Sequence, residues 1–309
     1  MAELNQVEKD LLKTITGIDD PLSGAYNLRL NGKPFAKQSS QNIEIRSKTD
    51  RPGIDIIIAP GTKYEEVHIP VILTEAGLRD LVYNDFYVGE DADVVIVAGC
   101  GIHNCACEDN AHDGIHAFHI AKNARVRYLE KHYGEKEQTG QNEMNPTTIV
   151  ELAENAQMEM DTSQIRGIDR TVRVTRAKLA ENATLKITER ILTDGEQRAE
   201  TRFEVDLDGE NAKTHVISRS VACGHSHQLF LSRVNGNHMC TGHTECDAII
   251  MDEASVSAKP EINANSPDAR LIHEAAIGKI AGEQLIKLMT LGLTEKEAEE
   301  KIINGFIAS

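Results

Sequence analysis

A short motif, Glu-Asn-Ala, recurs along this chain of 309 residues, at 154–156, 181–183 and 210–212. Near-copies extend the series, namely Glu-Asp-Ala at 90–92, Lys-Asn-Ala at 122–124 and Asp-Glu-Ala at 252–254. The six alanines are therefore 32, 32, 27, 29 and 42 residues apart. Self-similarity at this spacing is typical of solenoids, in which each repeat packs only on its neighbours. The motif thus predicts one long, stacked body.

The residues after each motif alternate between apolar and polar side chains. The apolar members include Val94, Ile96, Val126, Tyr128, Met158, Met160, Leu185 and Ile187. A period of two indicates strands, and we find no helical stripe between residues 88 and 275. Asn, Asp and Gly at the junctions suit tight turns. The sequence therefore predicts a mainly β chain that forms a right-handed parallel β-helix, and a β-sandwich with chance similarity is the alternative.

The two ends of the chain carry helical patterns. One helical face at residues 4–16 is formed by Val7, Leu11, Leu12 and Ile15, so residues 1–40 are expected to be a helical segment and linker. The β-helix core is expected at 41–275, interrupted by a helical stretch at 76–83.

Residues 276–309 are expected to form two helices. Gly292 ends the first, and Thr294 with Glu297 forms a capping box that begins the second. These helices either cap the last rung of the solenoid or provide a docking surface for another protein.

Composition excludes several classes of partner. The formal net charge is −16 and the pI is near 5.2, which opposes binding to nucleic acid or anionic membranes. Residues 1–15 lack a continuous apolar segment, and no run is long enough to cross a bilayer, so we expect a cytoplasmic protein. Cysteines in that compartment stay reduced, and the six here are expected to bind metal, handle sulfur or pack as small apolar residues.

Two groups of thiols and imidazoles could carry chemistry. The first spans twenty residues and comprises Cys100, His103, Cys105, Cys107, His112, His116 and His119. Zinc, iron and iron–sulfur centres favour these ligands, although the paired Cys-x2-Cys spacing of a zinc finger is absent. The alternative is a loop between rungs whose thiols are incidental.

The second group is Cys240, His243 and Cys246, followed along the chain by His273 and Glu274. Gaps of two residues let both ends of a turn face one ion. Mixed thiolate, imidazole and carboxylate ligation would bind iron less firmly than four thiolates, which suits a site that must release its cargo. The alternative is a structural cysteine buried in a strand.

Cys223, His225 and His227 would share one face of a strand, because alternate residues point the same way. The chain has no Gly-x4-Gly-Lys-Ser/Thr phosphate loop, so it is not expected to hydrolyse ATP by itself. It also lacks the Gly-x-Ser-x-Gly and His-Glu-x-x-His motifs of hydrolases.

Four stretches resemble the SufB/SufD family, the scaffold of the SUF iron–sulfur assembly machinery. They are residues 88–104, residues 217–222, Cys-Thr-Gly-His-Thr-Glu-Cys-Asp at 240–247 and Leu-Ile-His-Glu-Ala-Ala-Ile-Gly-Lys-Ile at 271–280. The resemblance implies a right-handed parallel β-helix, a transient iron–sulfur cluster, and an ABC-type ATPase like SufC docked on the C-terminal helices. It also implies roles in cluster assembly for Cys246, Glu274 and His273. Cys240 and His243 are further candidate ligands, with Cys100, His103 and Cys105 as weaker ones.

Better-known SufB and SufD chains carry a longer N-terminal region and form a heterodimer. Because this chain has thiol, carboxylate and imidazole together, we expect a homodimer with two ATPase subunits. The predicted function is a non-enzymatic scaffold that receives sulfur from a donor and passes clusters to apo-protein clients. The alternatives are a structural adaptor for the ATPase and, from another class, a β-helix lyase or hydrolase acting on polysaccharide. The cluster type, the donor and the clients do not follow from the sequence.

Overall fold

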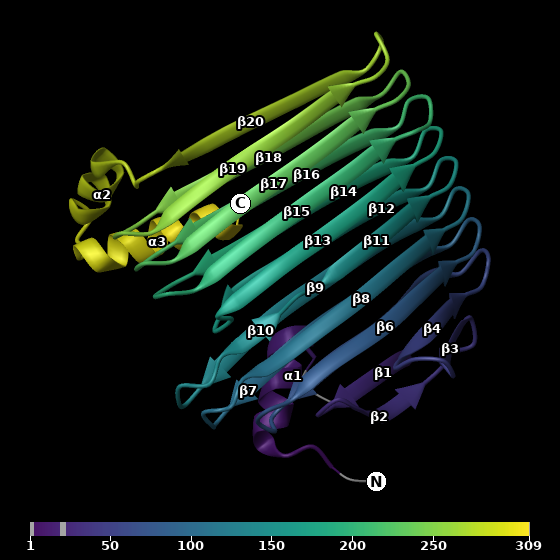
Figure 1. Ribbon diagram of the computed structural model, residues 1–309, viewed down its shortest axis with the longest axis horizontal. Coiled ribbons are helices and arrows are strands. Elements are labelled where there is room, and N and C mark those ends of the chain that lie inside the picture. Colours follow the sequence, from purple (N-terminus) through teal and green to yellow (C-terminus); the bar gives the residue numbers. More distant parts are fainter. Residues whose placement is uncertain (1–2, 19–22, 309) are drawn as a thin grey trace.

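The computed structural model describes residues 3–18 and 23–308, which form a parallel β-solenoid of about eight turns (Figure 1). The strands make two sheets, here called sheet A and sheet B. Sheet A runs in the order β2 (Lys33–Gln38), β1 (Ala25–Leu30), β5 (Lys63–Leu73), β7 (Asp93–Asn104), β9 (Arg125–Lys136), β12 (Gln157–Arg166), β14 (Thr184–Thr193), β16 (Lys213–Ala222), β18 (Thr241–Ile250) and β20 (Arg270–Gly278).

Sheet B faces it across the core. Its strands are β19 (Ser255–Ala264), β17 (His227–Gly236), β15 (Arg198–Leu207), β13 (Arg170–Leu179), β10 (Asn142–Met144), β8 (Asn110–Ile120), β6 (Arg79–Val88), β4 (Gly53–Ile58) and β3 (Ile43–Ser47), with β11 (Thr147–Leu152) between β8 and β13. The eight apolar residues named above are all buried between the sheets, which confirms the strand prediction.

The repeated motif forms one corner of the solenoid. Its middle residue adopts a left-handed backbone, with φ between 56° and 59° at Asp91, Asn123, Asn155, Asn182 and Asn211. Asparagine and aspartate tolerate this conformation better than other residues with a side chain. The alanine that follows is fully buried in every one of these five copies, so the motif encodes a turn and the small residue that lets the next rung stack closely.

The sixth predicted copy of the motif, at 252–254, does not belong to this corner. Residues 252–254 lie between β18 and β19, in a different corner, and Asp252 rather than Glu253 is left-handed. Lys213, Thr241 and Arg270 occupy the same register position on three successive strands of sheet A. The alanine column therefore continues through Cys240 and Ala269, the residues that precede Thr241 and Arg270.

The expected helix at 76–83 is also wrong, because residues 79–83 belong to strand β6 and residues 76–78 precede it without forming a helix. Asp80 and Asn84 point inward in this strand and are buried. Because these inward positions are polar, the sequence does not show the apolar alternation that predicts a strand. The expected linker likewise contains the hairpin of β1 and β2, and β1 pairs with β5 at the end of sheet A.

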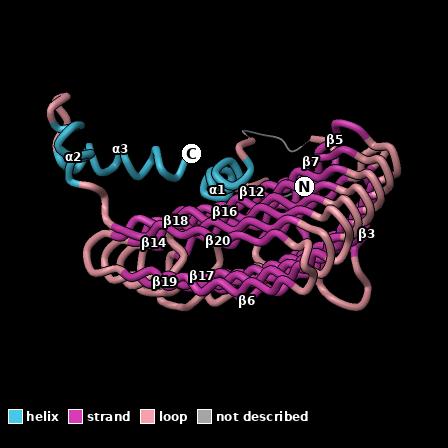
Figure 2. The backbone as a smooth tube through the Cα atoms, turned by 90° about the horizontal axis from the view of Figure 1, so that it is seen from above, coloured by secondary structure: helices cyan, strands magenta, loops and turns pink. Residues whose placement is uncertain are grey.

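Helices α1 (Gln6–Thr16) and α3 (Glu295–Ala308) lie over sheet A, whereas α2 (Gly282–Met289) packs on α3 beyond the ends of the strands (Figure 1, Figure 2). Helix α1 confirms the predicted N-terminal helix and the burial of Leu11, Leu12 and Ile15, whereas Val7 is 40 % exposed. It packs on β7, where a Cβ atom at Gly99 would lie 3.0 Å from Ile15. Helices α2 and α3 follow β20. Arg190 of β14 donates a hydrogen bond of 2.8 Å to the Ile307 carbonyl, which fixes the end of α3 to the sheet. None of the helices in the described part of the chain is long and apolar enough to span a membrane.

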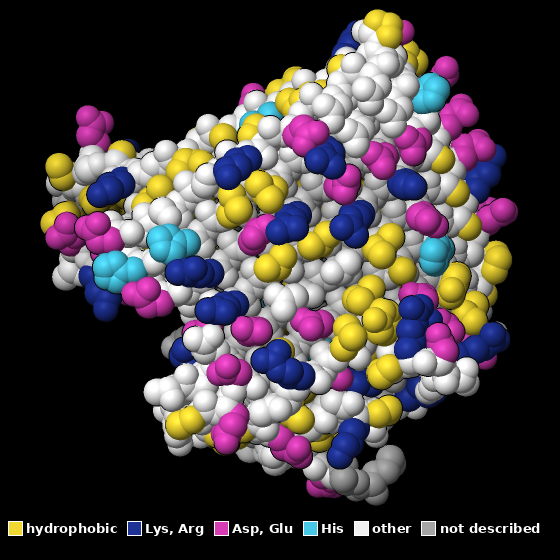
Figure 3. Space-filling view, viewed as in Figure 1, with side chains coloured by type: hydrophobic (Ala, Val, Ile, Leu, Met, Phe, Trp, Pro, Cys, Tyr) yellow, Lys and Arg dark blue, Asp and Glu magenta, His cyan; other side chains and the backbone are white. Residues whose placement is uncertain are grey.

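The face of the molecule formed by sheet B carries basic, acidic and hydrophobic side chains in a mixture (Figure 3). Several of the ions pair across strands, as Arg233 does with Glu204 and Glu261. This face therefore offers no continuous basic surface.

Candidate functional site

Strand alternation divides the predicted site residues between two faces of sheet A. In β18, Cys246 points into the solenoid and His243 points out, and in β20 His273 points in and Glu274 points out. Successive side chains of a strand always face opposite ways, so His273 and Glu274 cannot both reach Cys246 within one chain. The predicted convergence of Cys246, His273 and Glu274 therefore does not occur within a single copy.

Cys246 is 1 % exposed and lies in an inner column of residues from successive rungs. Ser218 is its register neighbour on β16, and Glu189 is the neighbour of Ser218 on β14. Burial, with smaller effects from Glu189 and Asp247, raises the pKa of the Cys246 thiol to about 12. On the other side, only Ala275 of the last strand covers it in register. The thiol is thus protonated at neutral pH and lies one rung from the end of the solenoid.

His273 lies on the same inner surface, diagonal to Cys246. Its Nδ1 atom is 2.6 Å from the hydroxyl of Thr244, the register neighbour of His273 on β18. Its Nε2 atom is buried and makes no hydrogen bond. Burial, followed by the nearby charge of His243, lowers the pKa of His273. This imidazole therefore favours the neutral form, in which a ring nitrogen can act as a ligand.

Four side chains gather on the outer face of sheet A, from β16, β18 and β20. The rings of His215 and His243 stack, with centroids 4.9 Å apart. Glu245 Oε1 lies 2.7 Å from Nε2 of His215 and 3.5 Å from Nδ1 of His243, and Glu274 Oε2 lies 3.4 Å from Nε2 of His243. One ligand atom each from His215, His243 and Glu245 lie within 4.8 Å of one another. Borderline metal ions accept this set of donors.

Sequence reasoning missed His215 and Glu245. Glu245 lies within the run from Cys240 to Cys246, which the sequence singles out for its cysteines. It follows His243 by two residues, so in a strand both side chains point to the same face. His215 lies 28 residues before His243, the same spacing that separates Ala212 from Cys240. A register derived from the repeat would have placed the two imidazoles side by side.

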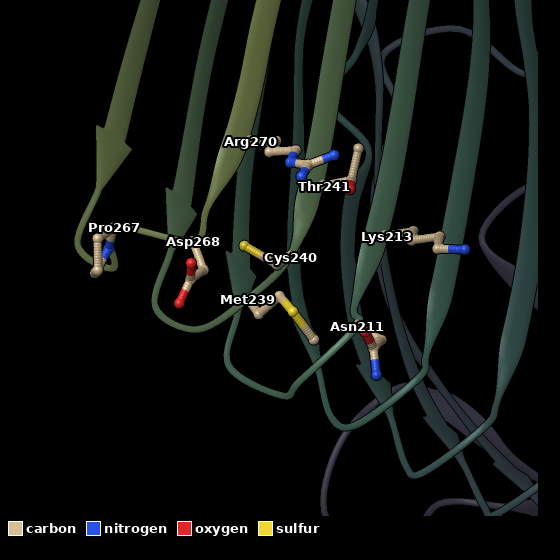
Figure 4. A pocket seen from close by; sticks show the side chains of 8 residues that line it. All are labelled: Asn211, Lys213, Met239, Cys240, Thr241, Pro267, Asp268 and Arg270. Carbon is tan, nitrogen blue, oxygen red and sulfur yellow. The ribbon is translucent and has the colours of Figure 1, made fainter.

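Cys240 occupies the alanine column at a corner and is 3 % exposed. It borders a cavity of about 340 Å³ (Figure 4), whose other lining residues are Asn211, Lys213, Met239, Thr241, Pro267, Asp268 and Arg270. Burial raises the pKa of the Cys240 thiol, opposed by a hydrogen bond from the backbone of His238. Its place in the column gives Cys240 a packing role. Five residues of β18, from Thr241 to Glu245, separate it from Cys246.

The middle of the interior holds a fully buried ionic network. Arg173 of β13 bonds Glu130 at 2.8 Å, Glu189 at 3.1 Å and Nδ1 of His132 at 2.9 Å. Ser218 donates to Glu189 at 3.1 Å, which links this network to the column of Cys246. Burial alone would raise the pKa of Glu130, but His132 and Arg173 lower it to about 2. Burial raises the pKa of Glu189 more than its partners lower it.

The early cluster of thiols and imidazoles is brought together only in part. Cys100, His112 and His116 line one small cavity inside the solenoid, with Glu130 and His132, and the other four members lie elsewhere. Cys100 is 1 % exposed and packs among apolar side chains, while Cys105 and Cys107 are exposed after the end of β7. His103 lies between two carboxylates of the neighbouring rung, Glu135 and Glu137, each at 3.5 Å. The structure therefore does not bring Cys100, His103 and Cys105 to one point.

Two histidines of that cluster, His112 and His116, face the interior cavity, and His119 does not. Nδ1 of His112 lies 3.2 Å from Asp80, and Nδ1 of His116 lies 2.7 Å from the hydroxyl of Tyr128, all inside the solenoid. His119 lies on the outer face of sheet B, 2.8 Å from Glu151. His112 and His116 are thus held by polar contacts inside the solenoid, and His119 is held by an ion pair on its surface.

The expected shared face of Cys223, His225 and His227 is wrong. Strand β16 ends at Ala222 and β17 begins at His227, so Cys223 and His225 lie in the turn between them. Cys223 contacts the sulfur of Met251 at 3.9 Å.

Comparison with known proteins decides the family. Residues 83–306 match the family model for the SUF system FeS cluster assembly, SufBD core domain. The chain belongs to the SufBD family. An iron–sulfur cluster assembly SufBD family protein of Methanocaldococcus jannaschii is 29 % identical over 255 residues, covering 82 % of this chain and 79 % of the relative. Relatives with the same description from Archaeoglobus fulgidus and Pyrococcus horikoshii are each 26 % identical, over 279 and 291 residues, covering 89 % and 93 % of this chain and 73 % and 85 % of theirs.

Membership of the SufBD family confirms the predicted resemblance and supports a role in iron–sulfur cluster assembly. The matched region contains both faces of the candidate site, helix α2 and all of α3 except its last two residues.

Proposed function

We propose that this SufBD family chain is a scaffold on which iron–sulfur clusters are assembled and passed on, and that it acts in the cytoplasm. The observation that carries the proposal is the inner surface of the last two rungs, where the Cys246 thiol and the unbonded Nε2 of His273 lie on adjacent strands. Thiolate and imidazole are both iron ligands. A sulfur donor would load this surface, and apo-protein clients would receive the cluster.

Access to Cys246 requires movement of the last rung. Beyond β18 only β20 follows in the described part of sheet A, and its residues Ala275 and Ala276 are exposed. The cover over Cys246 is therefore a single edge strand. Edge strands are held on one side only, so displacing this one costs less than opening the middle of a sheet.

Two copies are proposed to pair at this end. Strands β19 and β20 end their sheets, and Ile262 and Ile272 are 41 % and 53 % exposed there. A second copy placed on these edges would cover the apolar side chains and bring Glu274 of one chain near the end of the other. Such a homodimer would supply a carboxylate at the open end of the inner face, because Glu189, the carboxylate in the column of Cys246, lies two strands of sheet A away.

The proposed ATPase dock is the pair of C-terminal helices. Helix α2 has no buried residue, and Ile286, Met289 and Leu291 are 63 %, 41 % and 76 % exposed. Apolar side chains clustered at this exposure are a feature of protein interfaces. Because α2 follows directly from β20, an ABC-type ATPase bound there could transmit its conformational change to the strand that covers Cys246.

Anaerobic reconstitution tests the proposal. Purified chain receives ferrous iron, a sulfide source and the cognate ATPase with ATP, and bound iron and acid-labile sulfide are measured. We expect Cys246→Ala to lose most of both, while the control Cys223→Ala, which changes a thiol in the turn after β16 and outside the inner column of Cys246, keeps them. Equal cluster content in both variants would overturn the proposal and favour the second candidate, a structural adaptor for the ATPase.

A further inference from the structure

We infer that His215, His243 and Glu245 form a binding site for one ferrous ion on the outer face of sheet A, separate from the Cys246 thiol. This inference deepens the proposed scaffold function by naming a site where iron waits before it meets sulfur. The site is made of residues from two adjacent strands held in register, His215 opposite His243, so the scaffold itself fixes their spacing.

The donor set selects the metal. Two imidazoles and one carboxylate with open positions are the ligands typical of non-haem Fe²⁺ sites, whereas hard ions such as Mg²⁺ and Ca²⁺ prefer oxygen alone. Three protein ligands leave positions for water, which makes the ion exchangeable. A site for cargo needs that property.

The distances permit one ion. The three ligand atoms lie within 4.8 Å of one another, and Glu245 Oε1 already contacts a ring nitrogen of each histidine. The two rings are parallel within 4°, so one must rotate for both lone pairs to meet the ion. Rotation about the last torsion of histidine is broad and inexpensive. Binding replaces the imidazole proton that Glu245 now accepts from His215.

Glu274 supports the site from the last rung. Its carboxylate lies 3.4 Å from Nε2 of His243, and the side chain is 67 % exposed. A carboxylate beside the far nitrogen of a ligating histidine orients the ring and increases its basicity. Glu274 thereby links the outer site to the edge strand, on the opposite side of the sheet from His273.

The sheet separates this site from the thiols. Cys246 follows Glu245 directly and therefore points to the other face, inside the solenoid. Iron bound outside would thus have nitrogen and oxygen ligands only. The ligand type distinguishes this site from the cluster site.

Cobalt(II) titration under anaerobic conditions tests the inference, because cobalt bound by thiolate shows an intense charge-transfer absorption that nitrogen and oxygen ligands do not give. We expect one Co²⁺ per chain, competed by Fe²⁺, without the thiolate band. His215→Ala and Glu245→Gln should each weaken binding by at least about tenfold. The matched control His119→Ala removes a histidine from an isolated His–Glu pair on sheet B and should leave affinity unchanged.

The variant Cys246→Ala separates this inference from the proposed function. It should bind Co²⁺ as the unaltered chain does, even though it fails in cluster reconstitution. A thiolate band that disappears in His215→Ala, unchanged affinity in that variant, or loss of Co²⁺ binding in Cys246→Ala would overturn the outer site. Normal cluster reconstitution by a chain that binds no Co²⁺ would also overturn it while leaving the scaffold proposal intact.

Discussion

The middle and the C-terminal end of the solenoid differ in how fully their ionisable side chains are hydrogen-bonded. In the middle, Arg173 is enclosed by Glu130, Glu189 and His132, and each of these groups bonds another. At the end, Nε2 of His273 is buried without a hydrogen bond, and His215 and His243 share a single carboxylate oxygen of Glu245. Buried polar groups are normally satisfied, so a satisfied network indicates a structural role and an unsatisfied one at an open edge indicates a ligand site. The comparison predicts stability effects in the middle and binding effects at the end.

The largest effect is expected from Arg173→Met. Removing the cation leaves two buried carboxylates without it, a change that typically costs about 3–5 kcal/mol. The control is Arg176→Met in the same strand, because that side chain is 60 % exposed and makes an ion pair of 3.5 Å with Glu204. Surface pairs contribute about 1 kcal/mol or less. Urea denaturation measures both, and similar losses in the two variants would contradict the assigned role of the network.

The second effect concerns pH. Burial lowers the pKa of His132 to about 3 and that of His116 to about 4, against an ordinary value of 6.5. The unfolded chain therefore binds up to two more protons than the folded chain between roughly pH 6 and pH 4.5. The stability that these groups contribute is fully present above pH 6.5 and is lost as the pH falls towards 4.

Each such proton gives a slope of about 1.4 kcal/mol per pH unit. His132→Gln cannot take up this proton, and its amide oxygen can still accept from Arg173. The variant should therefore lower the slope of unfolding free energy against pH by about half of the two-histidine contribution. Denaturation at several pH values between 6 and 4.5 measures the slope, and an unaltered slope would mean that His132 is already protonated in the folded chain.

At the other end of the chain, Ile286→Glu should affect binding without affecting stability. The side chain is 63 % exposed on α2, so a charge there costs the fold little. At a protein interface the same charge should weaken ATPase binding by at least about tenfold. Calorimetry with the purified ATPase measures the affinity, with Leu81→Glu on β6 of sheet B as the control, because that side chain is 44 % exposed and belongs to neither proposed interface. Unchanged affinity of Ile286→Glu for the ATPase would show that the ATPase does not bind at these helices.

The smallest effect is expected from Glu245→Gln. Its side chain is 23 % exposed and its pair with His215 lies on the surface of the sheet. We expect a change in unfolding free energy of less than about 1 kcal/mol. A loss as large as that of Arg173→Met would show that the outer cluster is structural and would remove the contrast between the two regions.

Much of the fold follows from the sequence because one corner repeats. The left-handed Asn or Asp and the buried alanine must recur wherever rungs stack, and the apolar alternation after them fixes the strands. The error at 252–254 arose because another corner also uses Asp, and Cys240 concealed the true continuation of the alanine column.

The site was harder to predict than the fold. Cys246, His273 and Glu274 were identified by resemblance, but the face that each side chain takes depends on register. Polar interior residues such as Asp80 and Asn84 weakened the alternation that would have revealed register from sequence. The pairing of His215 with His243 likewise depends on the length of each turn of the solenoid.

The central claim is that cluster iron is held at the last rungs through Cys246. Its most direct test is Mössbauer spectroscopy of chain purified anaerobically with its ATPase, with and without Cys246→Ala. The account predicts iron–sulfur cluster signals in the unaltered chain and, in the variant, only isolated high-spin ferrous iron on nitrogen and oxygen ligands. Cluster signals of equal intensity in the two samples would contradict it.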